Sequence, residues 1–347
     1  MDYSVVIEWD NARFSERERS ISMLRALGKQ AAEFSAQRPP VKITFDPANV
    51  DVSLVRACLD EAAPATDHLD IEFLPVENSR YYSQKNYGFS RTESQFVIFL
   101  DSDVIPQPSW LKNLLGSFEH PDVDVACGET FMACSSNYER AFALFWFFNL
   151  KDKQPRLVRR NHFFANNVAF RREIFAQYNF PELDSFRGQC LALAHDLRRS
   201  GIPIFCNTGA SVEHPPPIDG RMFVRRALCA GYDETILNKA LDRPFHQRGP
   251  LGAGWRFATH LWRSGMKTIT RHRDVGLTPA GAVPALCLAG SFYTLKLMGE
   301  LISLIDPTLF ASMPGCNLPA GRSDPAERKG DRWTGSDPFH PEPSVPT

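Results

Sequence analysis

The sequence predicts an α/β fold, with a mainly parallel sheet flanked by helices and a helical extension after it. Short β-branched or aromatic runs alternate with segments of helical periodicity through the first two thirds of the chain. Past the proline run 215–217 the segments become basic or apolar and helical. The composition, with 43% hydrophobic and 23% charged residues among 347, excludes collagen, a coiled coil and wholesale disorder.

Apolar runs define the strands, and apolar residues at helical spacing define the helices between them. The expected strands are Ser4–Trp9, Val41–Phe45, Ile71–Val76, Phe96–Leu100, Val123–Phe131, Phe163–Phe170 and Ile202–Cys206. The expected helices are Ser15–Phe34, Val52–Ala62, Gln84–Ser94, Trp110–Phe118, Arg140–Leu150 and Gly188–Ser200. Because parallel strands end at one edge of a sheet, the polar segments 8–11, 46–49 and 101–103 should converge on one crevice.

The region after residue 215 has a different character. Met222–Leu241 and Gly254–Thr270 are expected to be basic amphipathic helices, and Val275–Leu295 is a stretch of 21 residues without a charge. Basic residues precede this stretch, as in a segment that lies on an anionic leaflet. Attachment to a membrane surface, a true span and an ordinary packed helical pair remain open. We expect a domain over residues 1–215, an extension over 216–305 and a disordered, proline-rich tail over 306–347.

Charge and cysteine usage limit the partners and the compartment. With 39 basic and 40 acidic residues, the chain is not a generally cationic nucleic-acid binder. Residues 151–172 nevertheless hold seven basic residues and one acidic residue, which could face phosphates or lipid headgroups or form a solvated loop. The eight cysteines contain no C-x-x-C pair, and the N-terminus lacks the basic and apolar regions of a secretory signal. A cytoplasmic location with reduced thiols is expected.

The most informative segment is FVIFLDSDVIP, in which an apolar strand runs directly into Asp101-Ser102-Asp103. Two carboxylates one residue apart at a strand end can share one cation with phosphate oxygens, and oxygen ligands suit Mg²⁺ or Mn²⁺. Alone this pattern is weak, because a solvated turn that caps the next helix has the same residues.

Other motifs accompany this segment in a fixed order. Lys85-Asn86-Tyr87-Gly88 lies upstream, and Asn166-Asn167-Val168-Ala169-Phe170-Arg171-Arg172 and Leu197-Arg198-Arg199-Ser200-Gly201 lie downstream. Together with the opening SVVI, the set resembles the inverting family 2 glycosyltransferases of the GT-A fold over roughly residues 3–235. This resemblance implies sugar transfer from a nucleoside-diphosphate donor to a polysaccharide or lipid-linked acceptor, and the basic segment before the apolar stretch leaves open a place at the inner face of the plasma membrane.

The resemblance also assigns roles to single residues. Asp46 matches the carboxylate that reads the nucleobase, and Lys85 a basic residue near the base and diphosphate. Asp101 corresponds to the carboxylate near the ribose and metal, and Asp103 to the metal ligand itself. His214 is similar to the histidine that completes the metal or diphosphate site in many relatives. Each of these residues could instead have an ordinary place in a turn, a helix or a loop.

Two departures from the family pattern affect the catalytic base and the first strand. The family's G-E-D falls on Gly188-Gln189-Cys190, and an amide is no base, while a thiol is one only with a lowered pKa. Asp184 is the first substitute base and Glu129 the alternative. At the first strand, Trp9 could stack on the nucleobase, whereas Glu8 near a diphosphate would be unfavourable unless paired or turned away.

Displacement at an anomeric carbon with an anionic leaving group requires charge neutralisation and a base for the acceptor hydroxyl. A metal-dependent glycosyltransferase therefore fits the motif set best. Loss of the G-E-D pair keeps open a non-catalytic protein that binds nucleotide sugars as a scaffold. A sugar-phosphate nucleotidyltransferase is disfavoured, because residues 8–13 after the first strand contain no glycine.

Overall fold

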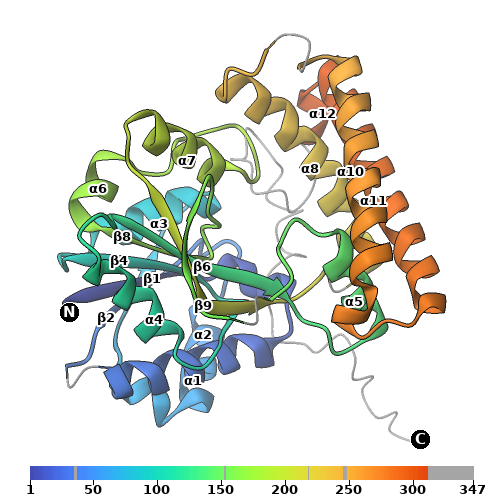
Figure 1. The fold of residues 1–347 in the computed structure, drawn as a ribbon. Coiled ribbons are helices and arrows are strands. Elements are labelled where there is room, and N and C mark those ends of the chain that lie inside the picture. The colour runs from blue at the N-terminus through green and yellow to red at the C-terminus, as the bar shows by residue number, and fades with distance from the viewer. Residues whose placement is uncertain (35–36, 152–153, 218, 245–247, 312–347) are drawn as a thin grey trace, which may run out of the picture.

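The computed structural model describes residues 1–34, 37–151, 154–217, 219–244 and 248–311 (Figure 1). Within them nine strands form one sheet in the order β3-β2-β1-β4-β8-β6-β9-β5, and β7 also pairs with β9. The strands are β1 Tyr3–Glu8, β2 Pro40–Phe45, β3 Asp70–Pro75, β4 Phe96–Asp101, β5 Ile105–Pro106, β6 Val125–Met132, β7 Leu157–Arg160, β8 Asn167–Arg171 and β9 Ile204–His214.

The two halves of the sheet differ in strand direction. In the first half β3, β2, β1 and β4 are all parallel, with Glu8 of β1 directly opposite Asp101 of β4. In the second half β8 runs antiparallel to β4 and β6, while β6 and β9 are parallel. The predicted α/β class is confirmed, and the carboxyl ends of β1, β2 and β4 form one edge, as parallel pairing requires.

Helices cover both faces of the sheet, because residues of the central strands are apolar on both sides. Along β1, Val5 and Ile7 join one core with α1, α2 and α4, while Val6 joins a second core with α3, α6 and α7. These helices are α1 Arg17–Phe34, α2 Val52–Ala62, α3 Tyr81–Ser90, α4 Trp110–Gly116, α6 Arg172–Gln177 and α7 Gln189–Arg199.

The extension forms a third layer that packs on the sheet domain through α5, which spans Asn137–Phe145 (Figure 1). Its long helices are α8 Gly220–Ala240, α10 Pro250–Arg271 and α11 Pro279–Ile305. α8 and α11 cross closely, because a Cβ at Gly231 would lie 2.1 Å from the Lys296 carbonyl oxygen and one at Gly299 2.2 Å from that of Leu228. By length and composition alone α11 could cross a membrane, and a third of its most apolar window is buried.

Several expected boundaries need correction. β9 continues to His214 rather than ending at Cys206, so this histidine lies at a strand end and not in a loop. β8 begins at Asn167 instead of Phe163, and α5 begins earlier than expected because Ser136 and Glu139 form a capping box. α5 also stops at Phe145 rather than Leu150, since Trp146 adopts extended backbone angles.

The chain after Ile305 also differs from the expected tail. Thr308–Ala311 forms α12, and Phe310 is buried with its ring 5.3 Å from that of Tyr232 on α8. The described chain therefore continues as packed structure into the region 306–311. The rest of the expected tail, residues 312–347, lies outside the described residues.

Candidate active site at the carboxyl ends of β1, β4 and β9

Asp101 is the most fully bonded carboxylate at the edge of the sheet. It ends β4 and receives hydrogen bonds from Asn11 Nδ2 at 3.0 Å, from the Tyr81 hydroxyl at 2.7 Å and from Lys85 Nζ at 2.7 Å. Lys85 is fully buried and also donates to the carbonyl oxygen of Leu100 at 3.2 Å. The ammonium group of Lys85 therefore holds Asp101 in place from beneath the site.

Glu8 and Asp10 add two further buried carboxyl groups beside Asp101. Neither carboxyl oxygen of Glu8 has a hydrogen-bond partner in the part of the chain that the structure describes. Burial raises the pKa of Glu8 well above its usual value, and the charges of Asp101 and Asp10 raise it further. Asp10 instead organises the loop after β2, because it accepts from the Asp46 backbone amide at 2.9 Å and from Asn49 Nδ2 at 2.9 Å.

Asp103 and His214 face each other across the turn that follows β4. β5 pairs antiparallel with β9, with Ile105 opposite Glu213, and this register brings Asp103 to within 3.9 Å of His214 Nε2. His214 Nδ1 lies 2.6 Å from the Pro215 carbonyl oxygen, which can only accept, so Nδ1 carries the proton and Nε2 presents a lone pair. Burial, together with Arg226, lowers the pKa of His214 to about 3, and the ring is neutral.

This pair fits a divalent cation. Asp103 is 6% exposed, and its Oδ1 has no hydrogen-bond partner among the described residues. Burial, together with Asp101, raises the pKa of Asp103 to about 7, so this carboxylate lacks sufficient positive charge around it. The carboxylate suits Mg²⁺ or Mn²⁺, and the neutral imidazole suits a transition-metal ion rather than Mg²⁺. The described residues contain no group of three or more such ligands, so other oxygens would have to complete the shell.

Two arginines that sequence reasoning missed bring positive charge to these carboxylates. Arg187 donates to Asn11 Oδ1 at 2.7 Å, and its guanidinium lies 4.0 Å above the Tyr81 ring. Arg226 comes from α8 of the extension, and both arginines interact electrostatically with Asp103. The only sequence signals were the position of Arg187 directly before Gly188 and the basic character of α8.

The extension also positions the loop that carries Arg187. Asp233 of α8 accepts hydrogen bonds from the backbone amides of Phe186 at 2.6 Å and Arg187 at 3.1 Å. Tyr232, the preceding residue, donates its hydroxyl to the carbonyl oxygen of Asp184 at 2.8 Å. α8 is therefore part of the site's architecture and not a separate appendage.

The residues at the G-E-D position are fixed in the core. Gly188 has a φ of 107° and begins α7, where a Cβ would lie 2.4 Å from a Leu237 methyl group. Gln189 donates to the Ser185 carbonyl oxygen at 3.2 Å. Cys190 is buried beside the Tyr82 hydroxyl, 3.4 Å away, and burial raises the pKa of its thiol. Cys190 therefore lacks the lowered pKa that a thiolate base requires.

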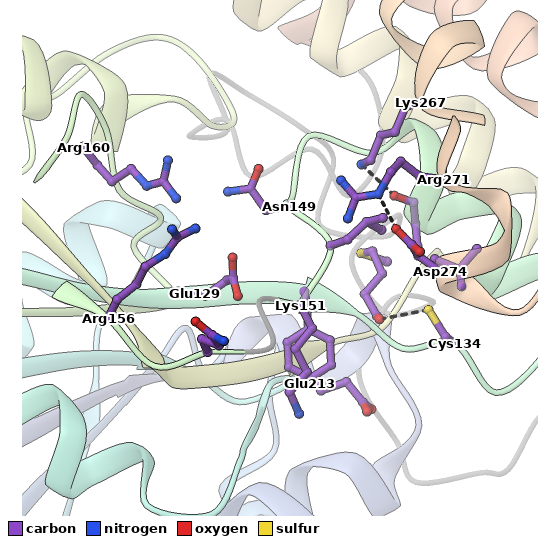
Figure 2. Close-up of a pocket in the computed structure, with 16 residues that line it drawn as sticks. Glu129, Cys134, Asn149, Lys151, Arg156, Arg160, Glu213, Lys267, Arg271 and Asp274 are labelled. Atoms are coloured by element: carbon purple, nitrogen blue, oxygen red, sulfur yellow. Dashed lines mark hydrogen bonds and ion pairs between the residues drawn. The ribbon is translucent and has the colours of Figure 1, made fainter. Parts of the chain in front are cut away.

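The two substitute bases occupy contrasting surroundings. The Asp184 side chain is 83% exposed and lies 3.2 Å from Arg80, in an ion pair at the surface. Glu129 is 5% exposed and lines a cleft of about 980 Å³ between β6, the segment after α5, and α10 (Figure 2). We call this the basic cleft, because its wall includes Lys151, Arg156, Arg160, Lys267 and Arg271.

Comparison with known proteins identifies the family that this chain resembles. Residues 55–178 match the model of glycosyl transferase family 2. The predicted resemblance to that family is thereby confirmed, over about a third of the chain. A pre-mycofactocin glycosyltransferase of Mycobacterium tuberculosis is 44% identical over 57 residues, which are 16% of this chain and 12% of that protein. The chain thus spans about an eighth of the length of the curated relatives that it matches.

A solved structure supports the fold. The mannosyltransferase PcManGT of Pyrobaculum calidifontis, in complex with GDP-Man and Mn²⁺, superposes with a TM-score of 0.54 at 12% identity. The alignment covers 88% of this chain and 87% of that one. At this identity the likeness concerns the fold alone, and it confirms the predicted GT-A architecture with its helical region after the sheet.

The other residues to which the family resemblance assigns a role in donor binding differ in how accessible they are. Trp9 is fully buried in the core, so its ring has no free face, contrary to the expected stacking on a nucleobase. Asp46 lies at the predicted strand end, and its Oδ1 accepts from the backbone amide of Ala48 at 2.9 Å in a turn. Lys85 contacts Asp101 rather than facing an open pocket. The roles of Asp46 and Lys85 toward a donor stay predictions.

The N-N-V-A-F-R-R segment has a structural basis. Asn167 is fully buried and accepts from Trp110 Nε1 at 2.8 Å. Its amide donates to the carbonyl oxygens of Glu129 at 3.2 Å and Ala210 at 2.9 Å, across β6 and β9. The preceding Asn166 accepts from the Thr130 hydroxyl at 3.0 Å. This motif fastens β8, β6 and β9 together next to Glu129.

Proposed function

We propose that this protein is a glycosyltransferase that moves a sugar from a nucleoside-diphosphate donor, with inversion, onto a polysaccharide or lipid-linked acceptor. The observation that carries the proposal is the buried Asp103–His214 pair, in which the Asp103 Oδ1 atom has no hydrogen-bond partner among the described residues and His214 Nε2 lies 3.9 Å from the same carboxylate. PcManGT was solved with GDP-Man and Mn²⁺, which supports a donor and a cation of this kind here. A Mg²⁺ or Mn²⁺ held by this pair would neutralise charge on the diphosphate.

The roles of this chain's own residues follow from their charges. Asp103 and His214 would hold the cation, and Arg187 and Arg226 would bind the phosphate oxygens as fixed donors. Asp101, held by Lys85 and Tyr81, would accept from the donor's ribose. The arginines stabilise negative charge that grows as the sugar leaves, so they favour the transition state over the ground state. Asp46 would read the nucleobase at the end of β2.

The catalytic base must take a proton from the acceptor hydroxyl. Asp184 is the base that the sequence favours, but its exposed ion pair with Arg80 places it in water. Glu129 gains support from its burial at the basic cleft. Replacing the true base by its neutral, isosteric amide should lower kcat by about 10²–10⁴-fold. Glu129→Gln and Asp184→Asn, measured side by side on acceptor-dependent turnover, separate the two candidates.

Release of nucleoside diphosphate tests the metal assignment. Asp103→Ala should lower divalent-dependent turnover by at least about 10²–10³, because it removes a ligand that acts on the leaving group. Glu72→Ala, at an exposed carboxylate on β3, is the matched control and should keep full activity. Undiminished turnover in Asp103→Ala would refute the site.

A scaffold that binds nucleotide sugars without turnover is the second candidate, and the burial of Gln189 and Cys190 favours it. Calorimetry with nucleotide sugars and Mn²⁺, paired with a product assay, decides between the two. Heat of binding without release of nucleoside diphosphate would favour the scaffold. Binding with release would favour the enzyme.

The extension, which we propose as a second unit over residues 216–305 beside a domain over 1–215, would attach the protein to an anionic membrane on its cytoplasmic side. Its α10 exposes Leu251, Trp255, Trp262, Met266 and Ile269, with Trp255 75% and Trp262 70% exposed. Their spacings of four, seven, four and three residues place them on one side of the helix. Tryptophans with flanking arginines are typical of helices at the interface of anionic lipids.

Sedimentation with vesicles tests this attachment. The full chain should bind vesicles that contain phosphatidylserine more strongly than neutral phosphatidylcholine vesicles. Trp255→Gln with Trp262→Gln should abolish most of this binding, whereas Val224→Gln, at an exposed residue of α8, should not. Equal sedimentation of all three proteins would contradict the proposal.

A further inference from the structure

The basic cleft combines residues from the sheet domain and from the extension. Figure 2 shows Arg156, Arg160 and Glu129 on one side and Lys267 and Arg271 on the other. Arg160 ends β7, whereas Lys267 and Arg271 lie on the last turns of α10. Apolar side chains of Phe131, Met132, Leu150 and Val275 line the same space.

Positive charge exceeds negative charge in this cleft. Five basic residues stand against three carboxylates, Glu129, Glu213 and Asp274. Two of the three are paired by known contacts, since Glu213 meets Arg19 of α1 at 3.2 Å and Asp274 meets Arg271. An excess of basic side chains along the wall of a cleft favours an anionic ligand.

Lys267 is the most constrained of these cations. Its Nζ donates to the carbonyl oxygens of Ala143 at 2.9 Å and Phe148 at 3.3 Å, near the end of α5. Burial, together with Arg271, lowers its pKa to about 8, so it is still mostly protonated at neutral pH. A bound anion would relieve the repulsion between Lys267 and Arg271.

The cleft shares a wall with the Asp103–His214 site. The Phe148 ring, whose backbone oxygen accepts from Lys267, lies 5.1 Å from the His214 ring. Met132 pairs with His214 in the register of β6 and β9 and lines the cleft. Glu213, the residue before His214, lines it as well. A molecule held in the cleft is therefore next to the place where the donor would react.

We propose that the basic cleft binds a phosphate group carried by the acceptor substrate. That the phosphate belongs to the acceptor substrate rests on the proposed function, but the binding of phosphate to the cleft can be measured without any sugar transfer. Basic side chains on both walls, Arg160 on one and Lys267 on the other, would attract the phosphate, and the apolar lining would receive the organic group attached to it. The phosphate could belong to a lipid or to a soluble ester.

Calorimetry on the full chain in EDTA, with inorganic phosphate as the probe, tests the site. Arg160→Gln and Lys267→Met should each weaken binding by about tenfold or more, because each removes a charged hydrogen-bond donor. Arg263→Gln removes one exposed charge from α10 outside the cleft and should leave the affinity within about twofold. A change of affinity in Arg187→Gln would reveal phosphate that binds at the Asp103 site instead of the cleft.

The outcomes separate this inference from the proposed function. Unchanged affinity in Arg160→Gln and Lys267→Met overturns it, as does an equal loss in Arg263→Gln or a loss confined to Arg187→Gln. Tighter binding of hexyl phosphate than of inorganic phosphate supports a lipid phosphate, and equal binding supports a soluble ester. A protein that binds phosphate here but transfers no sugar refutes only the proposed function. Donor turnover without phosphate binding refutes only this inference.

Discussion

Two clusters of buried charge in this molecule have opposite electrostatics. In the extension, Glu234 on α8 meets Lys296 of α11 at 3.1 Å and Arg243 at 2.6 Å. Although burial raises its pKa, these cations bring the pKa of Glu234 down to about 2. At the ends of β1 and β4, by contrast, the pKa values of Glu8 and Asp103 are raised by burial and by the neighbouring Asp101.

The difference separates a structural cluster from a binding one. Paired charges in the extension fix how three helices pack, and they need nothing further. Carboxylates without sufficient positive charge at the strand ends cost free energy, and the binding of a cation that we propose there would recover it. The following predictions change one charge at a time to test this comparison.

The largest loss of stability is expected at Lys85, because this residue pairs with Asp101 inside the strand-end site. Lys85→Met leaves the buried Asp101 without its cation and should lower the free energy of unfolding by about 3–5 kcal/mol. Urea denaturation measures this free energy of unfolding. Lys42→Met, in the half-exposed pair with Glu72, is the matched control and should cost less than about 1 kcal/mol.

A double-mutant cycle sharpens this result. Adding Asp101→Asn to Lys85→Met removes the uncompensated charge and should recover part of the lost stability. If Lys85→Met lowered the free energy of unfolding as little as Lys42→Met does, Asp101 would need no neighbouring cation. Lys85 and Asp101 would then no longer serve as the example of a satisfied charge pair within the site.

Glu234→Gln tests the paired cluster through pH. The folded pKa of about 2 lies below the usual glutamate pKa of 4.5, so the carboxylate contributes stability above about pH 4.5 and loses it as the pH falls toward 2. The shift corresponds to about 3 kcal/mol at pH 7. The gap between the native protein and Glu234→Gln in urea should therefore narrow on acidification. A constant gap from pH 7 to pH 2.5 would contradict the assignment.

Sequence patterns predicted the first half of the fold well because its strands are apolar on both faces. Ser4–Trp9, Val41–Phe45 and Phe96–Leu100 needed little correction, since burial in a parallel sheet leaves a continuous apolar run. The position of Asp101 and Asp103 followed from the same logic. The length of β9 did not, because its last residues include Glu213 and His214, which look like a loop.

The rest of the site depends on tertiary contacts that no local pattern contains. Arg226 reaches Asp103 from the extension, and Asp233 holds the backbone of Arg187. Trp9 looks like a stacking residue beside a polar loop, yet the packing of the core covers it completely. The helix was expected to continue through the aromatic residues 146–148, but the chain leaves the helix after Phe145, and Trp146 and Phe148 then join the core formed by α5, α10 and α11.

Glu8→Gln should have the smallest effect, and for that reason it tests the comparison most directly. The pKa of Glu8 is raised well above 4.5 by burial, by Asp101 and by Asp10, so ionisation of this group opposes folding as the pH rises above about 4.5. Glutamine imitates the protonated carboxyl group, so the substitution should change the free energy of unfolding by less than about 1 kcal/mol at low pH, where Glu8 is protonated in both the folded and the unfolded protein.

The sign of the change with pH carries the argument. Relative to Glu8→Gln, the native protein should lose stability, not gain it, between pH 4.5 and 8, which is the reverse of the trend for Glu234→Gln. Urea denaturation of the three proteins over the same pH series measures both trends together. A loss of 3 kcal/mol or more in Glu8→Gln at pH 7 would mean that Arg187 already pairs with an ionised Glu8. The strand-end cluster would then be as satisfied as the extension, and its carboxylates would have no reason to recruit a cation.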